Sequence, residues 1–180
     1  LKTKINEIEQ KERQKRDLEL KTLQQQLNPH MLYNVLNTIT RLAQFQGAGN
    51  IEEVSLSFAK MMKLISKTEG NFFTLKQEIE FIENFISVKK YNSFQDITLK
   101  TSIPESLLST PILKLLLQPF VENSIKYAFL NLEEPGVIYI DAFLTGSQIN
   151  ITIEDNGCGI PPDKIEQILA KPIIEYDNYI

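Results

Sequence analysis

Hydrophobic and polar residues follow a helical period through the first part of the chain. Residues 1–46 are rich in helix-forming residues, and neither glycine nor proline occurs before Pro29, so this stretch predicts one long helix. Its apolar positions recur every three or four residues near both ends, whereas the segment 11–16 is entirely charged or polar. A helix that can bury so little by itself is expected to pair with a second copy of the chain.

A second helix is predicted at 51–67, after the turn-forming sequence GAGN. Asn50 and Glu53 have the spacing of a capping box at its start. The apolar residues of this helix again recur at three and four, at Ile51, Val54, Phe58, Met61, Met62 and Ile65. Two helices joined by a short turn form a hairpin, and two hairpins make a four-helix bundle, so we expect residues 1–70 to form a dimerisation domain.

After residue 70 a connector helix is predicted within 71–94. Thr74 and Gln77 have the spacing of a capping box at its start, and it ends near Tyr91. The period then changes from helical to alternating, which predicts strands at ITLKTSI, GVIYIDAFLTG and QINITIED. The last two fit an antiparallel hairpin that turns around Gly146.

Two further helices are predicted in this second part. Thr110 followed by Pro111 is typical of a helix start, and this helix is expected to extend to about Phe129. A short helix is predicted at PPDKIEQIL. The fold class is therefore α+β: a helical hairpin is followed by a layer of strands and helices in 95–180.

Composition narrows the possible functions. The 180 residues carry a net charge of -4, without a basic surface stripe of the kind that binds nucleic acid. One cysteine excludes an internal disulfide, and with one histidine a structural zinc site is not expected. No apolar run is long enough to span a bilayer, so we expect no membrane insertion of this chain. Both ends look cut, which suggests a soluble piece of a longer protein.

The single histidine, His30, follows Pro29 in the first predicted helix. At 100° per residue, Asn34, Asn37 and Arg41 all lie within about 40° of it, opposite the apolar face. An unperturbed imidazole, with a pKa of about 6.5, is mostly neutral at neutral pH and can act as a nucleophile. An ordinary surface histidine would show the same pattern, so an electrophile has to be found elsewhere in the chain.

Two stretches of the second part could bind a phosphorylated electrophile. In LLLQPFVENSIKYAF, the residues Asn123, Lys126 and Tyr127 share one edge of a helix, where an amide can ligate Mg²⁺, a lysine can neutralise phosphate and an aromatic ring can cover a base. In IEDNGCGIPPD, Asp155 ends a strand and is followed by Gly157 and Gly159, which allow close backbone approach to a ligand. A solvated helix face and an ordinary turn would look the same, and neither the Walker loop nor the dinucleotide fingerprint is present.

Together these motifs resemble a known family. VENSIKYA followed by EDNGCGI resembles the N box and first glycine box of the GHKL ATP-binding fold, which histidine kinases share with type II topoisomerases, Hsp90 and mismatch-repair ATPases. QQQLNPHMLYNVLNTI resembles the phosphoacceptor motif of the LytS-like sensor histidine kinases, and TLKQEIEFIENFISVKKY resembles their connector helix. The resemblance covers roughly residues 20 to 170. It implies a GHKL-type α/β sandwich in 95–180, which is a partial ATP-binding domain.

The resemblance also implies a role for each matched residue. In the hairpin, His30 would be phosphorylated and Asn34 would help to position it. The nucleotide would be ATP with Mg²⁺, and Asn123 would be the metal ligand. The other expected contacts are Lys126 on phosphate, Tyr127 beside the adenine, Asp155 on the adenine amino group, Gly157 and Gly159 around that pocket, and Glu122 orienting Asn123 or a water.

Two departures from the family pattern are visible. Met31 and Tyr33 stand where phenylalanine is usual, and the second glycine box, which forms the ATP lid, is absent before Ile180. We therefore expect this chain alone to bind nucleotide poorly or to be inactive.

The implied function is the core of a two-component sensor histidine kinase. It would be a homodimer that autophosphorylates His30 and passes the phosphoryl group to an aspartate on a response-regulator receiver domain, in the cytoplasmic part of a bacterial membrane protein. A GHKL ATPase is a rival, but Pro119 stands where those enzymes carry the carboxylate that activates water. The other alternative is an inactive dimeric signalling scaffold with a vestigial nucleotide site.

Overall fold

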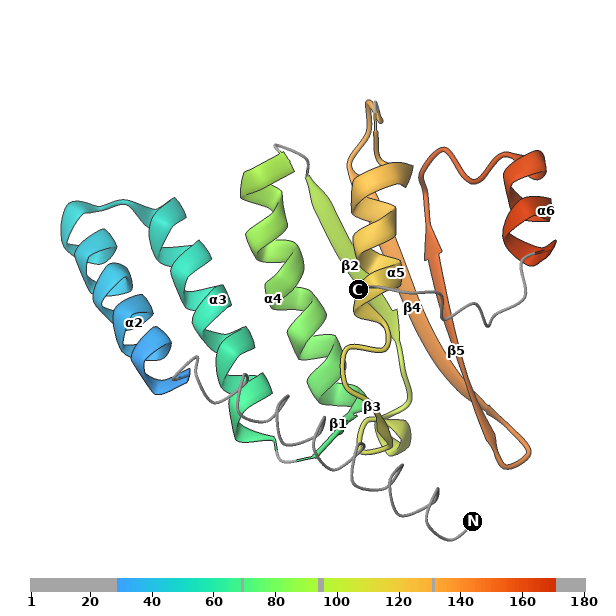
Figure 1. Cartoon of the computed structure of the whole chain (residues 1–180), viewed down its shortest axis with the longest axis horizontal. Coiled ribbons are helices and arrows are strands. Elements are labelled where there is room, and N and C mark those ends of the chain that lie inside the picture. Colours follow the sequence, from blue (N-terminus) through green and yellow to red (C-terminus); the bar gives the residue numbers. More distant parts are fainter. Residues whose placement is uncertain (1–28, 69, 94–95, 131, 171–180) are drawn as a thin grey trace, which may run out of the picture. The chain divides into compact units, whose positions relative to one another are not determined.

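The computed structural model describes residues 29–68, 70–93, 96–130 and 132–170. It divides into two units, Leu1–Gly70 and Asn71–Ile180, each of which is described by itself (Figure 1). The predicted helical residues before Pro29, and the end of the chain after residue 170, lie outside the described residues.

The first unit is a hairpin of two antiparallel helices, α2 (Pro29–Gln46) and α3 (Gly49–Lys67). Gly47, with φ +69°, makes the left-handed turn between them. The predicted hairpin is therefore confirmed, but the predicted capping box is wrong. Helix α3 begins at Gly49, with Ala48 as its N-cap and no side-chain capping bond. Backbone bonds through Ala48 take its place, because its N–H reaches Ala43 and its carbonyl accepts from Glu52.

The apolar face of α2 is divided between two environments. Ala43 is buried and Leu36 is half-buried. An adjacent set of large apolar residues on the same helix remains exposed, and we call it the α2 stripe: Met31, Val35, Ile39, Leu42 and Phe45. At 100° per residue these five span about 120° of the helix surface, as expected for a second packing face.

The second unit contains two small sheets and several helices. Its elements, in chain order, are β1 (Phe72–Thr74), α4 (Leu75–Ser93), β2 (Ile97–Ser102), the 3₁₀ turn η1 (Glu105–Leu107), β3 (Pro111–Leu113), α5 (Gln118–Asn123), the π-helical turn η2 (Ser124–Ala128), β4 (Gly136–Thr145), β5 (Gln148–Asp155) and α6 (Pro162–Ala170). The predicted connector helix, strands and final short helix are all present.

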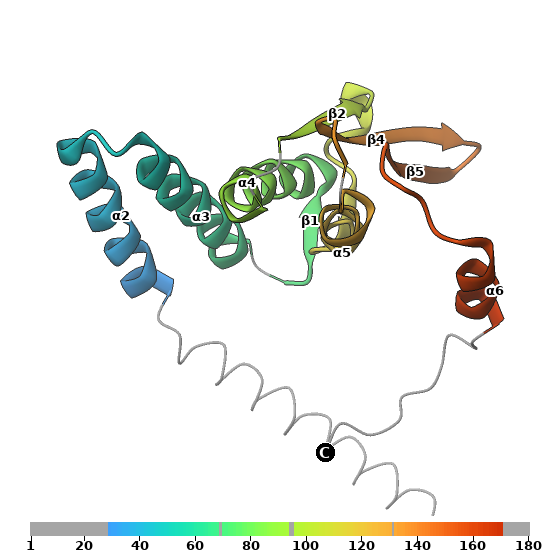
Figure 2. The ribbon, with the colours of Figure 1, turned by 90° about the horizontal axis from the view of Figure 1, so that it is seen from above.

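The larger sheet has the strand order β2-β4-β5. Strands β4 and β5 form the predicted antiparallel hairpin, with Thr145 opposite Gln148, whereas β2 runs parallel to β4. Both views show α4 and α5 on the same face of this sheet (Figures 1 and 2). The alternating residues Ile138, Ile140 and Ala142 of β4 are buried and form the sheet side of the core.

The capping box predicted at the start of α4 is confirmed. The Gln77 side-chain oxygen accepts from the Thr74 backbone N–H at 2.8 Å, and the Thr74 hydroxyl accepts from the Gln77 backbone N–H at 3.2 Å. This reciprocal pair satisfies two donors that would otherwise be unpaired at the helix start.

The helix start predicted at Thr110 and Pro111 is wrong. Residues Pro111–Leu113 form strand β3, which pairs antiparallel with β1. The helix begins at Gln118 instead, after Leu115 adopts a left-handed conformation with φ 58°. A Thr-Pro pair suits either a helix start or an edge strand, and here a partner strand some forty residues away in sequence decides between them.

Candidate functional site: a helix end joined to a glycine turn

The helix that carries the N-box residues changes its geometry where those residues lie. Helix α5 ends at Asn123 and continues as the π-helical turn η2, which contains Lys126 and Tyr127. All three side chains are exposed, and the Lys126 ammonium lies 4.9 Å from the centre of the Tyr127 ring. π-Helical turns are rare and occur frequently at functional sites.

Lys126 is suited to binding an anion. Tyr127 raises the pKa of this exposed amine above its ordinary value of 10.5, chiefly through a side-chain hydrogen bond. A lysine is already protonated at neutral pH, and this shift favours the charged form further. The exposed ammonium group lies beside the Tyr127 ring.

Asp155 joins the end of β5 to this helix. One carboxylate oxygen accepts a hydrogen bond from the Ser124 hydroxyl at 2.7 Å, and the other accepts from the Gly157 backbone N–H at 3.0 Å. Both bonds fix the orientation of the carboxylate, which is nevertheless exposed. Each carboxylate oxygen has a second lone pair, so Asp155 can still accept hydrogen bonds from a ligand. Sequence reasoning missed Ser124, which is adjacent to Asn123 and has a buried side chain.

The glycine turn packs directly against the end of the π-helical turn. A Cβ atom at Gly157 would lie 2.5 Å from both the side chain and the carbonyl oxygen of Ala128. The next residue, Cys158, donates its backbone N–H to the same carbonyl at 3.0 Å. Glycine is thus required at 157 by the protein's own backbone, whereas Gly159 has φ +69° and open space around it.

Glu122 faces α4. One of its oxygens accepts from the Gln118 side chain at 3.0 Å, and the other lies 3.8 Å from the Lys89 ammonium group. The contact with Lys89 links α5 to α4 immediately before Asn123, whereas the bond from Gln118 lies within α5. Lys89 and Gln118 are further residues of this region that sequence reasoning missed.

The phosphoacceptor candidate lies in the other unit. His30 is the second residue of α2, and Asn34 lies one turn further on, with an exposed side chain. The Asn34 carbonyl accepts a hydrogen bond from the Thr38 hydroxyl at 2.9 Å. The first unit therefore contains the two expected catalytic residues, and the second contains the expected nucleotide-binding residues.

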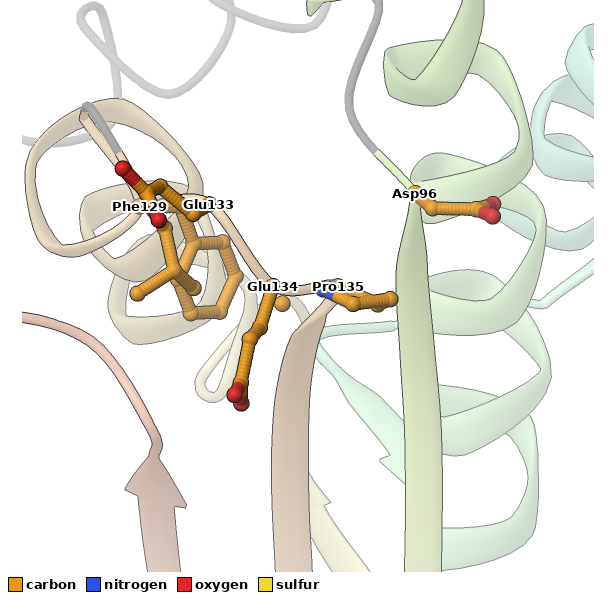
Figure 3. Close-up of a pocket in the computed structure, with 7 residues that line it drawn as sticks. Asp96, Phe129, Glu133, Glu134 and Pro135 are labelled. Carbon is orange, nitrogen blue, oxygen red and sulfur yellow. The ribbon is translucent and has the colours of Figure 1, made fainter.

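A cavity of about 200 Å³ lies outside this region. Its lining, from β2 to the start of β4, consists of Asp96, Phe129, Leu132, Glu133, Glu134, Pro135 and Gly136. Figure 3 shows the Asp96 side chain pointing away from Glu133 and Glu134. The cavity contains no candidate site residue, and its three acidic residues are unfavourable for a polyphosphate.

The described residues contain neither a metal-binding cluster nor a membrane-spanning helix. No group of three or more histidine, cysteine, aspartate and glutamate side chains is arranged there to hold a metal ion. No helix among these residues has both the length and the apolar composition needed to cross a membrane.

Comparison with known families matches both parts of the chain. Residues 18–97 match the histidine kinase family, and residues 109–177 match the family of histidine kinase-, DNA gyrase B- and HSP90-like ATPases. Together the two matches extend over most of the sequence, in the order expected for a kinase core. The chain belongs to the histidine kinase family, and the resemblance stated from its motifs is confirmed.

The chain is also similar to individual sensor kinases. It is 31% identical over 164 residues to an uncharacterized sensor-like histidine kinase of Staphylococcus epidermidis, covering 91% of this chain and 31% of that protein. A sensor protein LytS of the same species is 27% identical, covering 85% and 26%. The sensor histidine kinase BtsS of Escherichia coli K12 is 35% identical, covering 82% and 27%. The chain thus spans about a third or less of the length of these relatives.

Proposed function

We propose that this chain is the catalytic core of a bacterial two-component sensor kinase. It transfers the γ-phosphoryl group of ATP to His30 and afterwards to an aspartate of a response regulator. The observation that carries the proposal is that each of the two family matches falls mainly on one of the two units. The first unit is a hairpin that contains the sole histidine. In the second, the helix end that bears Lys126 is joined to the turn from Asp155 to Gly159.

The free lone pairs of Asp155 support its proposed contact with the adenine amino group. Its carboxylate is oriented by Ser124 and Gly157 but remains exposed. On the neighbouring turn, Lys126 then contacts the phosphates and Tyr127 lies beside the adenine. The Asn123 amide oxygen is a suitable ligand for Mg²⁺, which when bound would neutralise phosphate charge.

The transfer itself needs a neutral, correctly aimed imidazole. A ring nitrogen of His30 attacks the γ-phosphorus, the new N–P bond forms, and the bond from that phosphorus to the bridging oxygen of ADP breaks. An aspartate carboxylate oxygen of the regulator later attacks the same phosphorus, so that a new O–P bond forms, the N–P bond breaks and the imidazole of His30 is the leaving group. We assign Asn34, one turn along α2, to positioning the imidazole, because its exposed amide lies on the same side of the helix.

The exposed α2 stripe supports a homodimer. Five large apolar residues on one helix face are otherwise left in water, and a second hairpin would cover them in a four-helix bundle. We place this core on the cytoplasmic side of a bacterial membrane, where ATP is available.

The ATPase alternative is disfavoured by Pro119. This residue lies in the first turn of α5, four residues before Asn123, and it has no side-chain carboxylate that could activate water. The scaffold alternative predicts dimers without phosphorylation.

The test is labelling with γ-labelled ATP and Mg²⁺, on this chain and on a version that carries the family's second glycine box. We expect label that is labile in acid and stable in alkali, absent from His30→Ala. The His30→Ala protein should remain a dimer and bind ADP like the parent. If the extended protein dimerises but takes up no label, the scaffold alternative is favoured. Label that is stable in acid, or phosphate release from ATP by the His30→Ala protein, would contradict the kinase.

A further inference from the structure

Glu78 stands out because it is a charged residue in the protein core. It lies in the first turn of α4, and its side chain is 0% exposed. Among the residues whose burial the structure describes, no other charged residue is buried. Burying a carboxylate is costly unless its oxygens are paired. No role on the proposed phosphoryl-transfer path uses this group.

The Glu78 carboxylate bonds to the turn that starts α5. One oxygen accepts from the Leu115 backbone N–H and the other from the Leu117 backbone N–H, both at 2.9 Å. Leu115 has φ 58°, which is unfavourable for a leucine. In the described part of the chain, no other residue except glycine has a positive φ. A left-handed residue among successive amides forms a concave anion site, which the carboxylate occupies here.

Helix α5 has no capping side chain of its own. Leu117 is its N-cap residue and cannot accept a hydrogen bond through its side chain. Glu78 therefore acts as a cap supplied by another helix. Burial raises the pKa of Glu78, while the backbone donors of Leu117, Leu115 and Gln118 oppose that rise.

The turn controls where the N-box residues lie. Helix α5 contains six residues, so Asn123 is only about 7.5 Å along the helix axis from Gln118. At the far end the helix is held by Ser124 on Asp155, and along its length by Glu122 on Lys89. A change in the direction of the turn at Leu115 would therefore displace Asn123 relative to Asp155.

We propose that Glu78 is a positioning residue of the nucleotide site: its buried carboxylate holds the turn from Leu115 to Leu117 and so sets the direction in which α5 presents Asn123. This inference rests on the proposed function, because it assigns Asn123 to the bound Mg²⁺–nucleotide. Glu78 does not touch the nucleotide and acts through the helix.

The test uses the version that carries the family's second glycine box, because this chain alone is expected to bind nucleotide poorly. It compares Mg-ADP binding by calorimetry in that extended protein and in its Glu78→Gln variant, at a temperature where circular dichroism shows both to be folded. Glutamine keeps one acceptor oxygen but turns an N–H group toward a backbone N–H. We expect the Kd for Mg-ADP to rise about tenfold, as for one lost charge-assisted hydrogen bond. The Kd for ADP without Mg²⁺ should change less, because Asn123 is the proposed metal ligand.

Two variants serve as controls. Glu83→Gln removes the same charge from an exposed position of the same helix, and its Kd should equal that of the parent. Leu115→Gly, introduced into Glu78→Gln, removes the unfavourable conformation that the carboxylate stabilises and should restore most of the binding. A loss of stability without a change in positioning would lower the unfolding temperature but leave both Kd values unchanged.

A second measurement does not depend on the folding of a variant. If the Glu78 bonds favour nucleotide binding, nucleotide must in turn stabilise those bonds. Saturating Mg-ADP should therefore slow hydrogen exchange at the Leu115 and Leu117 amides of the unsubstituted extended protein. Unchanged exchange at both amides, or equal Kd values for the parent and Glu78→Gln, would overturn this inference alone. Failure of the unsubstituted extended protein to bind Mg-ADP would overturn the proposed function and the inference with it.

Discussion

The two units differ in how they bury their apolar residues. Of the twenty buried apolar side chains in the described residues, the hairpin contributes three: Ala43, Ala59 and Met61. The second unit contributes the other seventeen, including Phe73, Ile82 and Ile138 in its centre. The hairpin instead leaves the α2 stripe in solvent. The second unit therefore has its own core, whereas the helix that carries His30 has a packing face that needs a partner.

The two units also differ in how the first turns of their helices are capped. Helix α4 has a side-chain capping box, and α5 is capped by the buried carboxylate of Glu78. Helix α3 starts with backbone bonds alone. Side-chain contacts thus specify the second unit, while the hairpin depends more on assembly.

The largest expected effect comes from charging the α2 stripe. Leu42, which is 57% exposed, should lie inside the dimer interface, so Leu42→Asp should convert dimers to monomers. The matched control is Phe143→Asp, since Phe143 is similarly exposed at 48% but lies on the sheet of the second unit. Light scattering after size-exclusion chromatography measures the mass. An unchanged mass for Leu42→Asp would remove the proposed role of the stripe.

A smaller effect is expected at the glycine turn. Gly157→Ala places a Cβ against Ala128 and should lower the free energy of unfolding by about 1–3 kcal/mol, as overpacking does, and weaken Mg-ADP binding. Gly159→Ala meets no neighbouring atom and should cost only about 1 kcal/mol, from its left-handed backbone. Urea unfolding of the two variants makes the comparison. Equal losses would show that the contact with Ala128 does not govern this turn.

The two helix starts provide a matched pair of smaller changes. Thr74→Ala removes a hydroxyl that accepts the Gln77 N–H, and it should cost about 1 kcal/mol of unfolding free energy. Asn50→Ala changes a residue inside α3 that does not cap it, so stability should stay constant or rise by a few tenths of a kcal/mol. Thermal unfolding of both variants tests this. A larger loss from Asn50→Ala would reverse the comparison.

The last prediction concerns pH. Burial raises the pKa of Glu78 in the folded protein above its ordinary value of 4.5, so the folded state binds this proton more tightly than the unfolded state. Its contribution to stability is complete below 4.5 and is lost as the pH rises through the folded pKa. The difference in unfolding free energy between the parent and Glu78→Gln should therefore fall as the pH rises above 4.5. Urea unfolding over a pH series measures it, and a difference that grows with pH would mean that the backbone donors outweigh burial.

Part of the site could be predicted because its signals are local. An aspartate at a strand end, two following glycines, and a helix with Asn123, Lys126 and Tyr127 are all visible within short stretches of sequence. The partners of these residues were not visible, because Ser124 and Lys89 meet Asp155 and Glu122 only through the fold. One signal was available for Glu78: at 100° per residue it lies between Ile82 and Phe85 on the apolar face of its helix.

The sequence by itself determined the elements that depend on neighbouring residues. These are the hairpin helices, the capped start of α4, the alternating strands β4 and β5, and the motifs that identify the family. Their periodicity and caps act over a few residues, so no distant partner is needed to specify them.

Only the tertiary structure decided the segment between β2 and α5. Pro111–Leu113 is a strand because it pairs with β1. The helix begins at Gln118, after a turn whose backbone N–H groups bond to the Glu78 carboxylate. The parallel pairing of β2 with β4 likewise joins residues about forty positions apart. Such contacts form between segments that are remote in sequence, and local propensity does not specify which of them will meet.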